Sequence, residues 1–239
     1  MSLEVQLGAI RLEFTDQKLF NLLLRNISEE KRAKILKIRR KDDRMRALFA
    51  DILVRTMICK NNQCKNDQIH FEYNSYGKPF LTGISDIYFN VSHSAEWVVV
   101  ALSTARVGID IEEIKMLDYR SIAERYFSNI EAKDILKKKD NQQLEYFYIL
   151  WTLKESFVKN SGWGLSKPLN SFSITINKKN AYVLNDNGQI STEYHFLHWP
   201  IDSEHYSCSI CVKEDSKSIK LFKTIFTQKE LVTDFKQYI

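Results

Sequence analysis

The chain has 239 residues, of which 44% are hydrophobic and 12% aromatic, and it carries a net charge of +5 at pH 7. These values exclude an intrinsically disordered chain and leave room for one large domain or two small ones. No apolar run approaches the ~20 residues that span a bilayer, and no secretory signal is visible at the start. With only four cysteines, we therefore expect a cytoplasmic protein without membrane contact.

The first part of the chain predicts a strand, three helices and then a sheet. Periodic apolar positions place the helices, with Thr15 or Asp16 expected to cap the first helix and Ser28 the second. Runs of β-branched and aromatic residues between turn residues place the strands. In chain order we expect a strand over 4–14, helices over 17–25, 28–39 and 42–60, and strands over 69–74, 87–94 and 97–103.

The second part of the chain repeats this mixture of helices and strands. Ser128 is the expected cap of one helix, while Gly162 and Gly164 end another and Pro168 prevents its resumption. We expect a strand over 107–114, helices over 119–127, 128–138 and 141–160, strands over 171–177, 181–185, 194–199 and 206–212, and a helix over 227–238. This order predicts an α+β fold with two similar-sized halves, residues 1–105 and 106–239.

Two acidic residues alternate with apolar ones in "VGIDIEEI", residues 107–114. This is the period of a strand with one polar face, so Asp110 and Glu112 point to the same side. Two carboxylates at ~4 Å repel by about 4 kcal/mol at an effective dielectric constant of about 20. The stretch alone leaves two explanations open. The acids separate at a solvated sheet edge, or they hold a cation such as Mg²⁺, which takes one or two protein carboxylates.

The helix "FYILWTLKESFVKN" places Trp151, Glu155 and Lys159 on one face, because they are spaced by four residues. In one interpretation Glu155 and Lys159 form an exposed ion pair beside a half-buried tryptophan. In the other, Glu155 is a third carboxylate for the cation and Lys159 donates to a phosphate that the cation also touches. The spacing alone does not separate the two interpretations.

Two turns add groups that suit phosphate. The turn in "SYGKPF" supplies Gly77, Lys78 and Pro79, and "NVSHS" places Ser92, His93 and Ser94 at the end of a short strand. Hydroxyl, imidazole and backbone N–H groups there can receive phosphate oxygens. A serine next to a histidine is only a weak signal for nucleophilic catalysis, since no acid is positioned to orient the histidine.

A basic segment lies between residues 31 and 46, where nine lysines or arginines stand against two aspartates. A solvated helix face is the ordinary explanation of such a run, and contact with nucleic acid is another. Interspersed apolar residues indicate a folded amphipathic region. Such a region can also hold a compact polyanion.

The stretch "HFLHWPIDSEHYSCSIC" superficially resembles a zinc site. Its end, "HYSCSICV", is typical of a strand, in which Cys208 and Cys211 are three residues apart and face opposite sides. Two such residues cannot bind one metal together. We therefore expect ordinary strand residues there.

Five stretches together resemble the 4'-phosphopantetheinyl transferases of the surfactin-synthetase-activating type: "SEEKRAK", "YGKPF", "FNVSHSAEWVVVAL", "VGIDIEEI" and "FYILWTLKESFVKNSGWGLSKPLNSFSI". They run in order from about residue 28 to about residue 175, and the pairing of G-[IV]-D-[IV]-E with W-x-x-K-E-[SA]-x-x-K is highly specific. The resemblance implies two related α+β halves about a pseudo-twofold axis, with coenzyme A and Mg²⁺ between them. It also implies transfer of phosphopantetheine from coenzyme A to a serine of a carrier protein, with release of adenosine 3',5'-bisphosphate.

The resemblance assigns roles to individual residues. It implies that Asp110, Glu112 and Glu155 bind Mg²⁺, with Mn²⁺ as a substitute, and that Asp110, Glu155 and Lys159 are catalytic. Around coenzyme A it places Lys31, Lys34, Arg46 and His93 near the 3'-phosphate and adenosine, Gly77, Lys78 and Pro79 around the adenine, and Ser92 and Lys159 at the pyrophosphate, with the motif lysine Lys154 beside Glu155.

The expected partners follow from the same resemblance. We expect coenzyme A and, transiently, an acyl or peptidyl carrier protein of fatty-acid, polyketide or nonribosomal-peptide synthesis, and a chain that acts as a monomer. Residues 1–105 are expected to bind the adenosine side of coenzyme A, and residues 106–239 the Mg²⁺, the pyrophosphate and the carrier. The main alternative is a non-catalytic relative that binds coenzyme A or a carrier protein. A nucleic-acid-binding module is disfavoured, since the chain shows no recognised motif or aromatic platform for it.

Overall fold

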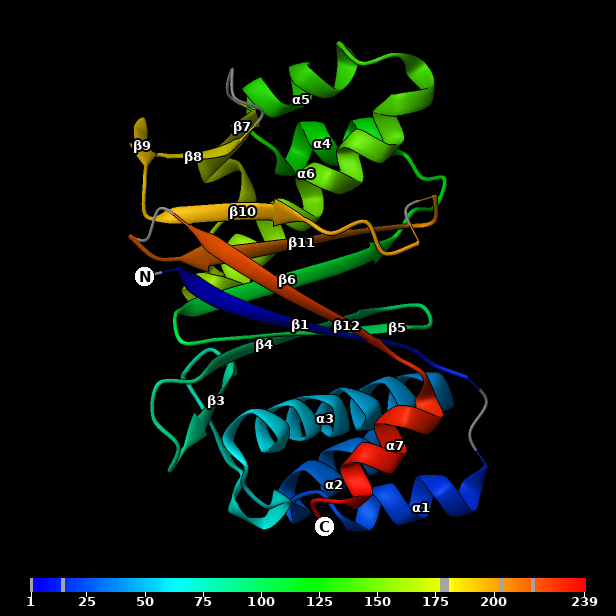
Figure 1. Cartoon of the computed structure of the whole chain (residues 1–239). Helices are drawn as coiled ribbons and strands as arrows, with labels where there is room; N and C mark the ends of the chain where they lie inside the picture. The colour runs from blue at the N-terminus through cyan, green and yellow to red at the C-terminus, as the bar shows by residue number, and fades with distance from the viewer. Residues whose placement is uncertain (1, 14–15, 177–180, 203, 216–217) are drawn as a thin grey trace.

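The computed structural model of the chain describes residues 2–13, 16–176, 181–202, 204–215 and 218–239. Two sheets lie against each other in the middle of the molecule, and helices cover the outer face of each sheet (Figure 1). The four layers are therefore helices, sheet, sheet and helices. Within the described residues, no helix combines the length and apolar character that a membrane span requires.

The first sheet joins the two ends of the chain. Its strand order is β12-β1-β5-β4, in which β1 pairs with β5 in the antiparallel and with β12 in the parallel sense. A separate hairpin of two strands connects the helices to β4. The elements of this side are β1 (Leu3–Arg11), α1 (Gln17–Arg25), α2 (Glu29–Lys37), α3 (Lys41–Asn62), a 3₁₀ turn (Asn66–Gln68), β2 (His70–Tyr73), β3 (Pro79–Thr82), β4 (Tyr88–Ser94), β5 (Trp97–Ser103), β12 (Ile219–Phe226) and α7 (Gln228–Lys236).

The second sheet has the order β10-β11-β6, and all its pairs are antiparallel. A three-stranded sheet, β7-β8-β9, lies beside it. The elements of this side are β6 (Arg106–Glu113), α4 (Tyr119–Tyr126), α5 (Asn129–Leu136), α6 (Asp140–Ser161), two 3₁₀ turns (Gly164–Ser166 and Leu169–Ser171), β7 (Phe172–Ile176), β8 (Tyr182–Asp186), β9 (Gln189–Ser191), β10 (Tyr194–His198) and β11 (Tyr206–Lys213).

The apolar core lies in three layers that follow from the alternation of the strands. Val98 and Val100 of β5 pack against the helices α1 and α3, whereas Val99 between them packs in the layer between the two sheets. Because β5 is buried on both faces, its sequence "WVVVALS" is a continuous apolar run. Helices α4, α5 and α6 cover the outer face of the second sheet with two further apolar clusters.

The α+β class expected from the sequence is confirmed, and each predicted helix is present within a few residues of its expected bounds. Asp16 caps α1 by accepting from the N–H of Leu19 at 2.8 Å. Thr15, the other expected cap, lies outside the described residues, as do the last positions of the strands expected over 4–14 and 171–177. Ser28 and Ser128 cap α2 and α5 as expected.

Three strands of the structure were missing from the sequence-based prediction. Strands β3 and β9 belong to short hairpins, and β12 forms the outer edge of the first sheet. Through β12 and α7 the C-terminal segment returns to the N-terminal side, where α7 packs against α3 (Figure 1). The division into residues 1–105 and 106–239 remains a prediction. Strand β12 and helix α7 belong to the second range but pack with the elements of the first.

Candidate active site

The site forms where strand β4 of the first sheet lies beside strand β6 of the second. Alternate residues of β4 point toward β6, since side chains of a strand repeat every two residues. The side chain of Asn90 accepts from the N–H of Ile109 at 2.9 Å, and the hydroxyl of Ser94 accepts from the N–H of Glu113 at 3.0 Å. These bonds fix the acidic strand β6 to the first sheet.

Asp110 is the centre of this site. It is buried, and its Oδ1 accepts from the Ser92 hydroxyl at 2.9 Å and from the Lys159 ammonium at 2.6 Å. Lys159 also donates to the Ser92 hydroxyl at 2.8 Å. Among the described residues the other oxygen, Oδ2, has no hydrogen-bond partner although it is buried. A buried carboxylate oxygen without a partner is costly, so this oxygen is suited to a ligand.

The two other predicted carboxylates lie near Asp110 and are strained electrostatically. Burial and the charge of Asp110 raise the pKa of Glu112 to about 7, although its Oε2 accepts from the Ser94 hydroxyl at 3.1 Å. Burial and Asp110 also raise the pKa of Glu155. Both shifts indicate that a second and a third negative charge beside Asp110 are unfavourable unless a positive charge joins them.

Helix α6 brings Glu155 and Lys159 to this strand because Gly108 leaves room for it. A side chain at Gly108 would overlap with the backbone of α6, at the carbonyl of Ser156 and 2.5 Å from the N–H nitrogen of Asn160. The buried Asn160 side chain donates to the carbonyls of Arg106 at 2.7 Å and Cys211 at 2.9 Å, which fastens the helix to both strands.

The predicted face of α6 is confirmed. Trp151, Glu155 and Lys159 are half-buried, while the residues between them are buried. The expected alternative, an exposed pair between Glu155 and Lys159, is not what the structure shows, since Lys159 binds Asp110 of the neighbouring strand. The spacing of four residues identified the face of α6 correctly. The partner of Lys159 is set by strand β6, on which this face packs.

The residues fit a hard divalent cation, although they do not form a closed cage. Among the described residues, no three side chains of histidine, cysteine, aspartate or glutamate are grouped tightly enough to hold a metal by themselves. The free Oδ2 of Asp110 and the raised pKa of Glu112 nevertheless favour a bound cation. Mg²⁺ commonly uses one or two carboxylates and completes its shell with water and substrate phosphate. An open oxygen-rich site of this kind matches that preference.

The Lys154 side chain does not point into this site, although the family resemblance places Lys154 among the residues around coenzyme A. Its ammonium is fully buried and donates to both oxygens of Glu131 and to the carbonyl of Phe172, each at 2.7 Å. A helix turns by about 100° per residue, so neighbouring residues face different directions. The contact of Lys154 with coenzyme A stays a prediction, and its ammonium is bonded inside the core.

Arg46 and His93 lie together at the start of α3. The Arg46 guanidinium donates to the carbonyl of Ala95 at 2.6 Å and pairs with Asp43. Desolvation by neighbouring protein atoms lowers the pKa of His93, and the positive charges of Arg46 and Lys159 lower it further. The residue is nevertheless partly exposed to solvent. Two positively charged groups near one imidazole are consistent with an anion site at this place.

The remaining predicted residues surround the hairpin β2–β3. Lys34 pairs with Glu30 at 2.6 Å and lies 3.8 Å from the centre of the Tyr73 ring, which brings α2 to the hairpin. Lys31 lies one turn earlier on α2 and is half-buried. The hairpin turn with Gly77 and Pro79 adjoins the end of α6, but the Lys78 side chain binds backbone carbonyls there. Because its ammonium is bonded there, Lys78 would contact the adenine through its backbone.

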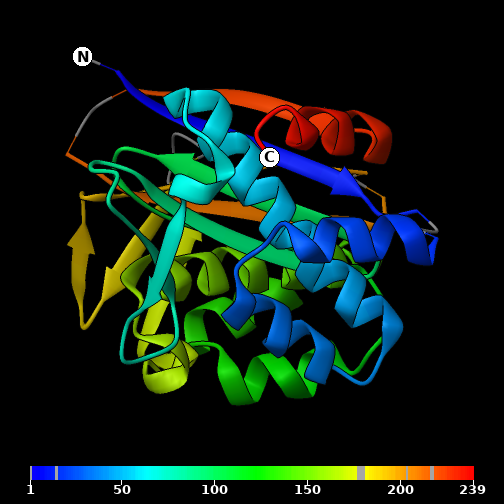
Figure 2. The same ribbon diagram turned by 90° about the horizontal axis from the view of Figure 1, so that it is seen from below.

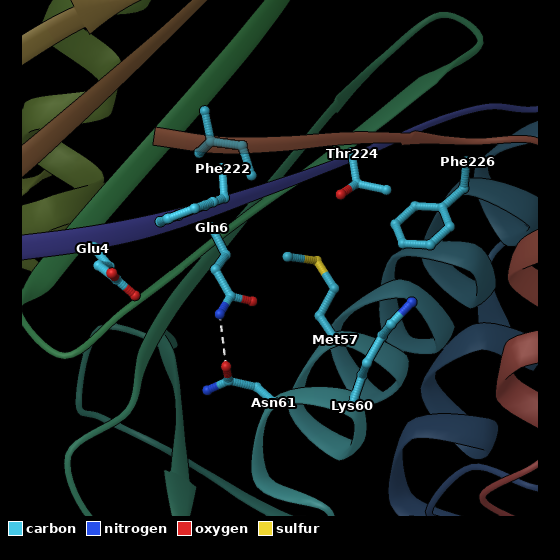
Figure 3. Close-up of a pocket in the computed structure, with 9 residues that line it drawn as sticks. Glu4, Gln6, Met57, Lys60, Asn61, Phe222, Thr224 and Phe226 are labelled. Atoms are coloured by element: carbon cyan, nitrogen blue, oxygen red, sulfur yellow. Dashed lines mark hydrogen bonds between the residues drawn. The ribbon is translucent and has the colours of Figure 1, made fainter. Parts of the chain in front are cut away.

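A pocket of about 340 Å³ lies elsewhere, between α3, strand β1 and the edge strand β12 (Figure 3). Gln6 donates to Asn61 at 2.6 Å on its wall. None of the residues that line it belongs to β4, β6 or α6. This pocket is therefore separate from the carboxylate site.

Cys208 and Cys211 face opposite sides of β11, as the strand pattern predicted. Cys208 lies in the layer between the sheets, and Cys211 packs with the cluster under α6. Both thiols are buried and free, and burial raises both pKa values well above the usual range.

Comparisons with known proteins identify the family of the chain. A family described as "4'-phosphopantetheinyl transferase superfamily" matches residues 106–211, and one described as "4'-phosphopantetheinyl transferase, N-terminal" matches residues 15–105. The chain is 42% identical over 174 residues to the 4'-phosphopantetheinyl transferase Sfp of Bacillus subtilis, which covers 73% of this chain and 74% of that protein. The chain belongs to the 4'-phosphopantetheinyl transferase superfamily.

A second curated relative gives the same result. The 4'-phosphopantetheinyl transferase gsp of Aneurinibacillus migulanus is 38% identical over 196 residues, which cover 82% of this chain and 80% of that protein. A solved holo-(acyl-carrier-protein) synthase from Bacillus anthracis in complex with CoA (3',5'-ADP) has a TM-score of 0.39 and 23% identity. It covers 47% of this chain and 97% of that chain. The resemblance read from the sequence is confirmed at the level of the family.

Sequence reasoning missed two residues that shape this phosphopantetheinyl transferase site, Gly108 and Asn160, and it assigned Ser94 to phosphate and not to Glu112. Ser94 binds Glu112, Gly108 admits α6, and Asn160 fastens it. The alternation of Asn90, Ser92 and Ser94 was a usable signal, because it predicts three polar side chains on one face of β4. The close approach of α6 to Gly108 depends on tertiary packing and has no local signal.

Proposed function

We propose that this chain transfers the 4'-phosphopantetheine group of coenzyme A to a serine of an acyl or peptidyl carrier protein and releases adenosine 3',5'-bisphosphate. The observation that carries the proposal is the buried Asp110, with Lys159 on one oxygen and a free second oxygen, beside Glu112 and Glu155. Membership in the transferase superfamily supports the same activity. A protein that only bound coenzyme A would not need such a costly group of charges.

The reaction exchanges one phosphorus–oxygen bond for another. The serine oxygen forms a bond to the phosphorus that carries pantetheine, the bond from this phosphorus to the bridging oxygen breaks, and the serine proton is removed. Glu155 would accept this proton, directly or through a water. Lys159 donates to the pyrophosphate oxygens where negative charge develops.

Asp110, Glu112 and Glu155 would hold Mg²⁺, with Mn²⁺ as a substitute. A divalent cation at this place supplies Lewis-acid polarisation of the phosphoryl oxygens and stabilises the leaving bisphosphate, an effect worth several kcal/mol. The Oδ2 atom of Asp110 is the ligand oxygen that the structure leaves free among the described residues. Ser92 joins this group through its bonds to Asp110 and Lys159.

The adenosine side of coenzyme A would lie against the N-terminal half. The basic residues Lys31, Lys34, Arg46 and His93 would surround the 3'-phosphate, and the backbone of the hairpin turn at 77–79 would contact the adenine. The carrier would approach the C-terminal half, where its serine reaches the carboxylates. We further propose that the enzyme acts as a monomer in the cytoplasm, where its four cysteines stay reduced.

Labelling with a fluorescent coenzyme A tests the proposal. The chain is incubated with Mg²⁺, coenzyme A that carries a fluorophore on its thiol, and an apo carrier protein, and the carrier is followed by gel fluorescence. The account expects covalent label on the carrier and none on a carrier whose acceptor serine is replaced by alanine. Tight binding of coenzyme A without any label on several classes of carrier would instead favour the non-catalytic alternative.

A further inference from the structure

The Lys78 ammonium binds the end of helix α6, although Lys78 lies on the hairpin of the other half. Its Nζ donates to the carbonyl of Lys159 at 2.5 Å and to that of Asn160 at 3.1 Å, with the carbonyl of Val107 at 3.5 Å. Burial and the nearby Arg106 lower the pKa of Lys78 to about 8. The side chain is thus half-buried and satisfied by three backbone oxygens.

These acceptors are the groups that a helix leaves unsatisfied. The last four carbonyls of an α-helix have no partner within the helix, and the helix dipole makes this end negative. α6 ends at Ser161, so the carbonyls of Lys159 and Asn160 belong to this set. A lysine ammonium at this position is both a hydrogen-bond donor and a favourable charge for the helix end.

The hairpin is attached to both halves of the molecule. At its base, Phe71 and Leu81 pack against the apolar core of the N-terminal side. At its tip, the Asn74 side chain donates to the carbonyl of Gly162 at 3.2 Å and accepts from the N–H of Lys78 at 2.9 Å. Figure 2 shows the hairpin reaching from the N-terminal helices to the end of α6. Lys78 and Asn74 therefore connect one half to the helix that carries the catalytic groups of the other.

We propose that Lys78 is a positioning residue, which fixes the last turn of α6, and with it Lys159, to the β2–β3 hairpin. The inference rests on the proposed transferase function for its catalytic consequence. Lys78 binds the backbone carbonyl of the same residue whose ammonium lies 2.6 Å from Asp110. Contacts of the hairpin turn with coenzyme A are thereby transmitted to the group that stabilises the departing phosphate.

The test replaces Lys78 by methionine, which keeps the apolar stem and removes the ammonium. Lys65→Met is the matched control, since Lys65 also donates to a backbone carbonyl, that of Gln237 at 3.0 Å, far from α6. Asn74→Asp is a milder second variant that keeps the acceptor for Lys78 and removes the donor to Gly162. Hydrogen–deuterium exchange of peptides over 156–163 is measured together with kcat and with KM for coenzyme A.

We expect faster exchange over 156–163 in Lys78→Met, with exchange in β1 and α3 unchanged. A displacement of about 1 Å at a catalytic group can cost about a hundredfold, so kcat should fall about ten- to a hundredfold, while KM changes by less than about threefold. Asn74→Asp should show smaller changes in the same direction, and Lys65→Met should resemble the parent.

Two results would overturn the inference. A raised KM with unchanged kcat and unchanged exchange would mean that the ammonium contacts coenzyme A directly. Faster exchange throughout the molecule with normal kcat would mean that Lys78 contributes only to general stability. The exchange measurement does not depend on transfer, so a parent chain without transferase activity would contradict the proposed function and leave the attachment of α6 to be judged by itself.

Discussion

At the scale of single residues, the site places negatively charged groups close together, which lowers the stability of the folded state. Glu112 illustrates the conflict, because burial and Asp110 raise its pKa from 4.5 to about 7. Between these values the folded protein keeps a proton that the unfolded chain has released. Unfolding then releases protons, so the contribution of Glu112 to stability falls as the pH rises from 4.5 to 7.

We therefore predict that Glu112→Gln stabilises the protein in the absence of divalent ions. Each pKa unit corresponds to about 1.4 kcal/mol, which suggests a gain of about 1–3 kcal/mol at pH 8 after allowance for partial exposure. The gain should shrink toward pH 4.5, where the parent carboxyl is protonated as well. Urea denaturation at several pH values measures this difference, and transferase activity should be lost in the same variant.

Glu113→Gln is the matched control, because Glu113 is the next residue of β6 and pairs with Lys115 at 2.6 Å outside the acidic group. It should show no pH-dependent gain. If Glu112→Gln is as stable as the parent or less stable at pH 8, the carboxylates are not under the electrostatic strain described here.

Lys31 provides a second residue-scale prediction, since it is expected at the 3'-phosphate of coenzyme A. A hydrogen bond to a charged group contributes about 1.5–3 kcal/mol, so Lys31→Ala should weaken coenzyme A about ten- to a hundredfold. Binding of 3'-dephospho-coenzyme A should be nearly unchanged, because this ligand never makes the bond. Titration calorimetry of both ligands gives the coupling energy.

Lys37→Ala is the control on the same helix, since Lys37 lies on another face of α2 and is exposed. It should affect both ligands equally and weakly. Equal losses of the two ligands in Lys31→Ala would show that Lys31 acts through general charge, and the 3'-phosphate site would lie elsewhere.

At the scale of elements, the fit of α6 on β6 determines whether the proposed catalytic residues meet. The contact of helix α3 with strand β1, at Gly8, is looser than that of α6 with β6, at Gly108. A side chain at Gly8 would meet the flexible end of Met57 on α3, whereas one at Gly108 would meet the backbone of α6. A side-chain end can move aside, but a helix backbone with its own hydrogen bonds cannot.

We predict that Gly108→Ala costs more stability than Gly8→Ala and nearly abolishes transfer. Overpacking typically costs about 1–3 kcal/mol, and the backbone contact places Gly108 at the upper end or beyond it. Thermal unfolding and carrier labelling measure the two effects. Comparable stability and activity of the two variants would show that α6 can shift on β6 without consequence.

The elements also show how far sequence patterns reach. Amphipathic periodicity and caps such as Asp16 and Ser128 located the helices, because these signals are local. Strand β12 was missed since its sequence "IKLFKTIF" mixes lysines with apolar residues and its partner β1 lies at the other end of the chain. An edge strand with exposed lysines has a weak local pattern.

The site was predicted to a similar extent. Period-two and period-four spacing found Asp110, Glu112, Glu155 and Lys159, which the structure brings together between β6 and α6. The partners of buried lysines were not predictable in this way. The ammonium of Lys154 lies in the core on Glu131, and that of Lys78 lies on a helix end, because tertiary contacts decide where a long side chain is satisfied.

At the scale of the whole molecule, the two sides are joined at several places that surround the site. Strand β4 binds β6 through Asn90 and Ser94, and the hairpin binds α6 through Lys78. A ligand between the halves would therefore contact elements that are already held together. This arrangement is suited to a transferase that aligns two large substrates on one cation.

Dependence of transfer on a divalent ion tests the central claim most directly. The parent chain is freed of metal by exhaustive chelation, mixed with coenzyme A and an apo carrier protein, and the carrier is weighed by intact mass spectrometry before and after addition of Mg²⁺ or Mn²⁺. The account predicts no mass gain without the ion and the gain of one phosphopantetheine group on its return. Full transfer in the chelated sample would contradict it, since Asp110, Glu112 and Glu155 would then have no cation to hold.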